Sequence, residues 1–198
     1  MGKEKHLKKI ESLFEKSPVV SYASIERIIG ERKDKKRNKS KYAKFLIHYL
    51  VSKGRIKRLS KGYYTNRNDS PLAVFCFQPA YLGLQDALST HNLWGQETIP
   101  IIITTMHINP GIRNILDSNV MIRRINKRYF FGIQYEEDGE IAFPYSDIEK
   151  TFIDMIYFKQ PLDEETLKNF REKLNKKKLN SYLKHYPRRT RKIVLSYL

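Results

Sequence analysis

The sequence predicts an α+β protein in three parts, and three observations lead to this prediction. Apolar residues recur at helical spacing through the first third of the chain, which ends in two short runs that are typical of a basic hairpin. β-Branched and aromatic runs dominate the middle, where Asp138-Gly139 is typical of a tight hairpin turn. The end of the chain is again helical in pattern. The predicted parts are residues 1–69, residues 70–160 and residues 161–198, with the last packed on the second.

The charge divides unevenly between these parts. The 198-residue chain carries a formal net charge of +17. Residues 1–69 contain 20 Lys and Arg against 7 Asp and Glu, residues 70–160 contain 7 against 10, and residues 161–198 contain 11 against 4. Solvated lysine-rich ends are the simplest explanation. A basic module beside a near-neutral one instead favours an anionic polymer as partner, most often nucleic acid.

Two amphipathic helices are predicted at the beginning of the chain. HLKKIESLFEK, residues 6–16, and YASIERII, residues 22–29, place apolar side chains on one helical face. Ser21 is suited to cap the second helix, and Gly30 to close it.

A third helix and a basic hairpin follow. KYAKFLIHYLVSK, residues 41–53, precedes Gly54, a residue that often follows a helix end. Its predicted apolar stripe is Tyr42, Phe45, Leu46, Tyr49 and Leu50, with Lys41, Lys44 and His48 on the opposite face. RIKRL and YYT, joined by Ser60-Lys61-Gly62, read as two short strands. Three short helices and a hairpin in this order are typical of a winged helix-turn-helix, whose third helix enters the major groove.

Double-stranded DNA is therefore the predicted partner. Arginine suits guanine and asparagine suits adenine, so Arg37 and Asn38 are candidate base readers, while Lys41 and Lys44 suit phosphates. Exactly one of Tyr63 and Tyr64 should face outward, because neighbouring strand residues point to opposite sides. The predicted DNA-binding residues are Arg37, Asn38, Lys39, Ser40, Lys41, Lys44, Arg55, Lys57, Arg58, Lys61 and Tyr63.

The middle part reads as a mixed α/β domain. The predictions are a buried strand in AVFCFQ (73–78), a helix in YLGLQDALSTHNLWG (81–95), and strands within 99–106, 120–125 and 129–145. Ser146 and Glu149 have the spacing of a capping box that opens the next helix.

Two or three helices are predicted in the tail. Asp163 begins one of them, and Pro187 occupies the first position of the last. The tail also contains a basic cluster: Lys176, Lys177, Lys178, Arg188, Arg189, Arg191 and Lys192. Three interpretations remain open for it: a second DNA contact, a surface for RNA or an acidic partner, or solvated helix faces.

Three stretches resemble the AbiEi-type antitoxin and winged-helix regulator family of type IV toxin–antitoxin systems. They are GRIKRLSKGYYT, PAYLGLQDALSTHNLWGQETIPIIITT and SDIEKTFIDMIYF, and their order carries the resemblance. The resemblance implies a repressor of its own operon and an antitoxin against a nucleotidyltransferase-like toxin. The segment GERKDKKRNKSK departs from the family pattern in being longer and more basic.

Other classes of function are disfavoured. His91, His107 and Cys76 do not have the spacing of a compact metal motif, so no metal or cofactor is expected. The sequence contains no phosphate loop and no catalytic triad order, so we do not expect an enzyme. A single cysteine and the lack of a long apolar run favour a cytoplasmic protein without membrane association. The alternative function is an RNA-binding or protein-interaction module that uses the same basic surfaces.

Overall fold

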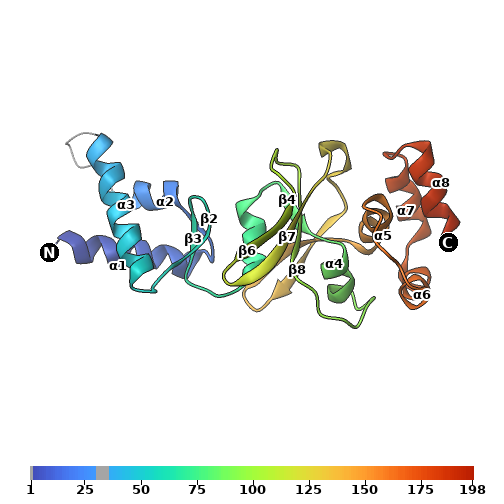
Figure 1. Ribbon diagram of the computed structural model, residues 1–198, viewed down its shortest axis with the longest axis horizontal. Coiled ribbons are helices and arrows are strands. Elements are labelled where there is room, and N and C mark those ends of the chain that lie inside the picture. The colour runs from blue at the N-terminus through green and yellow to red at the C-terminus, as the bar shows by residue number, and fades with distance from the viewer. Residues whose placement is uncertain (1, 30–35) are drawn as a thin grey trace. The chain divides into compact units, whose positions relative to one another are not determined.

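The computed structural model describes residues 2–29 and 36–198, and the side chains of residues 3–29 and 40–198 (Figure 1). The chain forms two compact units. One is Met1–Cys76 with Ile115–Asp117, and the other is Phe77–Asn114 with Ser118–Leu198. Helices and sheets occur in both units, which confirms the predicted α+β class.

The first unit combines three helices with a small antiparallel sheet of strand order β1-β3-β2. Its elements are α1 (Gly2–Lys16), β1 (Val20–Ser21), α2 (Tyr22–Ile28), α3 (Lys36–Ser52), β2 (Lys57–Ser60), β3 (Tyr63–Thr65) and the 3-10 helix η1 (Ser70–Cys76).

The three helices share one apolar core. Ile10 of α1, Ile25 of α2, and Leu46 and Leu50 of α3 are fully buried in it. The predicted cap of α2 is confirmed, because the Ser21 side chain accepts a hydrogen bond from the backbone N–H of Ser24 at 3.1 Å. Gly30, the predicted end of α2, lies outside the described residues.

The prediction for α3 was wrong in two respects. The helix begins at Lys36 rather than at residue 41, so the end of the basic segment forms its first turn. Phe45 is not part of the buried stripe, since its side chain is 53% exposed, whereas Ala43 and Ile47 are buried. The helical period alone could not separate these positions, because aromatic residues lie at the edge of the apolar face. Gly54 follows the helix with φ +66°, as predicted.

The second unit is built on a mixed six-stranded sheet of order β6-β7-β5-β4-β9-β8. β4 pairs antiparallel with β5 and parallel with β9, and β5 pairs parallel with β7. β8 and β9 form the predicted hairpin around Asp138-Gly139. The elements are β4 (Ala80–Leu82), α4 (Gln85–Thr90), β5 (Ile101–Thr104), β6 (Gly111–Ile115, which continues into the first unit), β7 (Ser118–Arg124), the 3-10 helix η2 (Lys127–Tyr129), β8 (Ile133–Asp138), β9 (Ile141–Ser146), α5 (Ile148–Tyr157), α6 (Glu164–Lys173), α7 (Lys176–Leu183) and α8 (Arg188–Ser196).

Two predictions in the middle of the chain were wrong. Residues 73–78 do not form a strand, because Ser70–Cys76 is a 3-10 helix. An apolar run has no period, so a buried strand and a buried helical turn look alike in sequence. The helix predicted over 81–95 is shorter, since Ala80–Leu82 pairs as a central strand and α4 begins only after Leu84, whose φ is +58°.

The tail helices gather around α5 (Figure 1). Phe152 of α5 packs against Phe170 of α6 at 4.8 Å between ring centroids, within a core that also holds Leu183 of α7 and Val194 of α8. Asp163 caps α6, as predicted, by accepting from the Thr166 N–H at 2.7 Å. Pro187 is the N-cap of α8 and not its first helical residue, because its ψ of 153° is extended. Within the described residues, no helix combines the length and the apolar character needed to cross a membrane.

Candidate nucleic-acid interface

The outward face of α3 is basic. Lys41, Lys44 and His48 are exposed, and they lie opposite the buried Leu46 and Leu50. The predicted exposure of these three residues is confirmed, and it follows from spacings of three and four residues. The apolar side fixes the helix in the core, so the three polar side chains are presented outward from a rigid support.

Tyr22 joins α2 to the beginning of α3. Its hydroxyl lies 2.9 Å from Ser40 Oγ and donates to the Ser40 carbonyl oxygen at 3.2 Å. Burial raises the pKa of Tyr22, so the phenol remains a neutral donor. Ser40, one of the predicted DNA-binding residues, is therefore already hydrogen-bonded within the fold, and its role on DNA stays a prediction.

Three further predicted site residues belong to the first turn of α3. The backbone of Arg37, Asn38 and Lys39 is helical. Their side chains lie outside the described part of the chain, as do residues 30–35 of the basic segment. Their predicted contacts with bases and phosphates remain predictions.

The cations of the hairpin differ in their partners. Arg55 forms an ion pair with Glu11 of α1, and its side chain remains 49% exposed. Lys57 donates to Asn68 Oδ1, and Arg58 Nε donates to the Ser60 carbonyl oxygen at 3.3 Å. Lys61 is exposed in the turn between the strands.

The two hairpin tyrosines are not divided as predicted. Tyr63 and Tyr64 are both half-buried, because the third strand, β1, lies beside β3. Tyr64 packs against the helical core and is the cross-strand partner of Arg58. Tyr63 is the residue that the sequence assigned to DNA, but it does not line the hollow described next.

A shallow hollow of about 240 Å³ lies between α3 and the hairpin. Its lining combines apolar and basic residues. The lining residues are Lys44, Ile47, His48, Val51, Arg58 and Tyr64. None of these six carries a carboxylate, so the hollow offers an anion three basic side chains and no repulsive neighbour.

The sequence did not assign His48, Val51 and Tyr64 to the site. A signal for the first two was present, because residues 44, 48 and 51 repeat at helical spacing along one edge of α3. Tyr64 could not be found in this way, since its place depends on the strand pairing that sets it opposite Arg58. The structure thus brings together Lys44 and Arg58, two of the predicted residues, with four that were not predicted: Ile47, His48, Val51 and Tyr64.

The second unit contains a buried polar network around Lys150. Lys150 and Asp154 form an ion pair with both side chains fully buried. Tyr81 Oη donates to Asp154 Oδ2 at 2.7 Å, and Lys150 Nζ donates to Tyr186 Oη at 3.2 Å. Burial lowers the pKa of Lys150 and raises that of Asp154, and the attraction within the pair opposes both changes. The network joins β4 to α5 and to the segment before α8. Its four side chains are buried, so we assign it a structural role.

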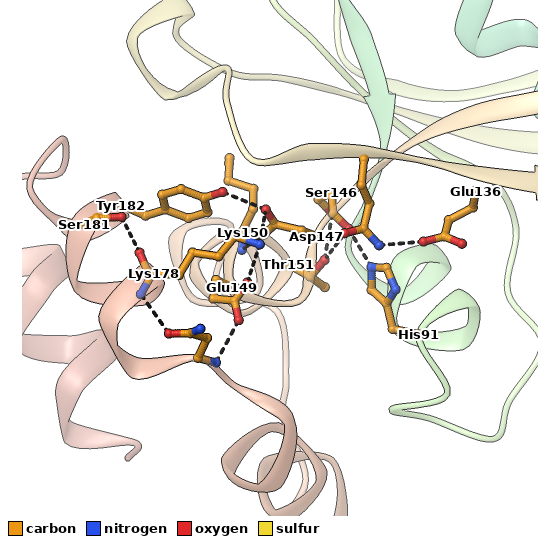
Figure 2. Close-up of polar contacts among 12 residues, drawn as sticks. His91, Glu136, Ser146, Asp147, Glu149, Lys150, Thr151, Lys178, Ser181 and Tyr182 are labelled. Atoms are coloured by element: carbon orange, nitrogen blue, oxygen red, sulfur yellow. Dashed lines mark hydrogen bonds and ion pairs between the residues drawn. The ribbon is translucent and has the colours of Figure 1, made fainter.

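The predicted capping box before α5 is wrong. Asp147, not Ser146, is the N-cap, and its Oδ1 accepts from the Lys150 N–H at 2.8 Å (Figure 2). Glu149 reaches away from the cap and accepts from the Asn175 N–H at 2.8 Å. Ser146 ends β9, and its hydroxyl lies 2.7 Å from Thr151 Oγ1. The capping pattern was present in the sequence, but β9 extends one residue further than the pattern allows.

Two cations of the basic tail have structural roles. Lys178 Nζ lies 3.1 Å from Asp147 Oδ2 and 3.0 Å from Glu149 Oε2, which ties α7 to the start of α5. Arg191 donates to the carbonyl oxygens of Tyr186 at 2.7 Å and Lys184 at 3.1 Å. The exposed members of the cluster are Lys176, Lys177, Arg188, Arg189, Arg191 and Lys192.

The histidines and the cysteine do not converge on a metal site in the described residues, where no group of three His, Cys, Asp or Glu side chains could hold an ion. His91 follows the last residue of α4, and its Nε2 lies 2.6 Å from the Ser146 carbonyl oxygen (Figure 2). Cys76 is buried, and burial raises the pKa of its thiol to about 12.

Comparison with known proteins gives no match to this chain, either among family models or among curated proteins.

Proposed function

We propose that this protein is a sequence-specific DNA-binding transcriptional repressor, with residues 1–69 acting as a winged helix-turn-helix. The observation that carries the proposal is the hollow between α3 and the β2–β3 hairpin, which is lined in part by basic residues of both elements. Lys44 and His48 reach it from the helix, and Arg58 reaches it from the hairpin. A helix and a hairpin that present cations to the same space suit a groove and the phosphate backbone beside it.

The proposed mechanism assigns different tasks to the two elements. α3 enters the major groove, which is about 12 Å wide and admits a helix. Lys41 and Lys44 contact phosphates and set the register, while Arg37 and Asn38, earlier on the helix, read bases. The hairpin, with Arg58 and Lys61, lies along the neighbouring backbone.

The proposal extends to regulation of a type IV toxin–antitoxin operon. Its support is the resemblance of the three sequence stretches, which implies repression of the protein's own operon and an antitoxin role. The partner in that role is a nucleotidyltransferase-like toxin, as a functional partner. Expression of this protein should then restore growth of cells that express a toxin encoded beside its gene. Persistent growth arrest with both proteins present would leave only the DNA-binding role.

A gel-shift titration tests the DNA-binding role. DNA from upstream of the protein's own gene is the probe, scrambled duplex is the competitor, and binding is measured at several salt concentrations. Specific retention is expected, with a log–log salt slope of about −0.9 for each phosphate contacted. Lys44→Ala should make the slope shallower by about 0.9, because one phosphate contact is lost.

Lys127→Ala is the matched control, since Lys127 is an exposed lysine in the second unit. Its slope should equal that of the unchanged protein. Equal effects of the two substitutions would contradict the assigned interface. Preference for single-stranded RNA over duplex DNA of equal length would instead favour the RNA-binding alternative.

A further inference from the structure

Phe45 is a large apolar side chain on the outward side of α3. Its ring is 53% exposed, although the amphipathic pattern predicts it to be buried. It lies four residues after Lys41 and one after Lys44, so it borders the basic face of the helix. An exposed aromatic ring among cations suits a surface that contacts both phosphates and an apolar group.

The ring is held in a defined position. Tyr42 stacks on it at 6.4 Å between centroids with an interplanar angle of 20°, and His6 Nδ1 lies 3.2 Å from the Tyr42 hydroxyl. Lys3 Nζ lies 5.2 Å from the centroid of Phe45 and 3.7 Å from that of Tyr49. Support from α1 therefore orients the ring before any ligand arrives, which lowers the entropy lost on binding.

On the basis of the proposed DNA-binding function, we propose that Phe45 contacts thymine methyl groups in the major groove and so selects A·T base pairs there. A phenyl ring cannot donate or accept hydrogen bonds as base readers do. The thymine C5-methyl is the apolar group that the major groove presents, and phenylalanine is one of the side chains that contact it. Lys41 and Lys44 beside the ring bind phosphates of any sequence, so the ring adds selectivity that they lack.

Removal of the methyl group alone is the direct test. The affinity of the whole protein is compared for an oligo(dA)·oligo(dT) duplex and for the same duplex with deoxyuridine in place of thymidine. A G·C duplex with and without 5-methylcytosine is the complementary test. It adds a methyl group at the C5 position of the pyrimidine, while the duplex keeps the shape of G·C base pairs. The expected effect is about fourfold tighter binding for each methyl that the ring covers.

Phe45→Ala should abolish the methyl dependence in both pairs of duplexes. Lys41→Ala should weaken binding to all four duplexes alike and keep the ratios. Tyr135→Ala is the matched control, since Tyr135 is a 69% exposed aromatic residue of β8. This substitution should change neither the affinity for the duplexes nor the dependence on the methyl group.

The outcomes separate this inference from the proposed function. Duplex binding without methyl dependence in the unchanged protein overturns the inference and leaves the DNA-binding role intact. Failure to bind any duplex overturns the DNA-binding role itself. If Phe45→Ala lowers the melting temperature and leaves the methyl ratios unchanged, the ring only packs against Tyr42, and the inference is wrong.

Discussion

Lys150→Met would leave Asp154 as a buried carboxylate without its cation. Both side chains are fully buried, and Asp154 would retain only the hydrogen bond from Tyr81. Breaking a buried ion pair by removing one partner costs about 3–5 kcal/mol, because the remaining charge is neither solvated nor compensated. We therefore expect the free energy of unfolding of the second unit to fall by about that amount at pH 7.

The loss of stability caused by Lys150→Met should increase as the pH rises from acid to neutral. Without Lys150, burial keeps the folded-state pKa of Asp154 above its unfolded value of 3.8. A raised folded-state pKa means that the folded state holds the proton more tightly. Stability is then fully present below about pH 4 and falls by about 1.4 kcal/mol per pH unit until the folded-state pKa is reached. The variant should therefore be closest to the unchanged protein in acid and furthest from it near neutrality.

Urea denaturation at pH 5 and pH 7, followed by circular dichroism, measures this difference. Lys150→Met combined with Asp154→Asn should remove the added pH dependence, since the carboxamide oxygen still accepts from Tyr81 and cannot ionise. Lys178→Met is the matched control. The Lys178 side chain is 41% exposed, and Asp147 and Glu149 keep other donors, so a loss of no more than about 1 kcal/mol is expected at either pH.

An equal loss at pH 5 and pH 7 for Lys150→Met would refute the reasoning. It would mean that Asp154 does not carry the charge that Lys150 compensates, and that the lysine stem contributes by packing alone.

Three further predictions concern single substitutions. Asp86 Oδ2 accepts from the Ile101 N–H at 3.1 Å, and burial raises the pKa of this carboxyl to about 7. Asp86 therefore contributes most to the free energy of unfolding below about pH 4, where its carboxyl is neutral, and this contribution is lost as the pH rises through 7. Asp86→Asn should stabilise the protein by about 2 kcal/mol at pH 8, after allowance for partial exposure, and have little effect at pH 4. Equal unfolding free energies for the two proteins at pH 8 would contradict this. Gly132→Ala should cost more than about 1 kcal/mol by urea denaturation, because φ is +67° and the new Cβ would lie 2.9 Å from Lys150 Cβ. A neutral result would show that α5 and its neighbours shift at little cost. Arg55→Ala should leave the DNA affinity within about twofold in the gel-shift assay, because the Arg55 guanidinium is paired with Glu11. A loss of affinity as large as that of Lys44→Ala would show that Arg55 contacts DNA.

The helices of the first unit and the hairpins of both units were predictable because their signals are local. The spacing of Lys41, Lys44 and His48 follows from the helical period, and Asp138-Gly139 forms its turn with little help from distant residues. Ser21 and Asp163 cap helices through hydrogen bonds that span only three residues.

The remaining features depend on partners that are distant in sequence. Ala80–Leu82 is a strand because β5 and β9 lie on either side of it, although its own residues read as the start of a helix. Glu149 has the spacing of a capping residue but instead accepts from the Asn175 N–H, and Arg55 pairs with Glu11 of α1, which lies 44 positions earlier in the sequence.

The sequence by itself determined the class of the fold, the order of helices and hairpin in the first unit, and the unequal division of charge. Only the tertiary structure decided which cations remain available to a ligand. The reason is that a cationic side chain pairs with a carboxylate or a hydrogen-bond acceptor within reach, and the packing of the elements decides which of these groups lies there. The same packing turned Phe45 outward and set Tyr64 opposite Arg58 beside the hollow.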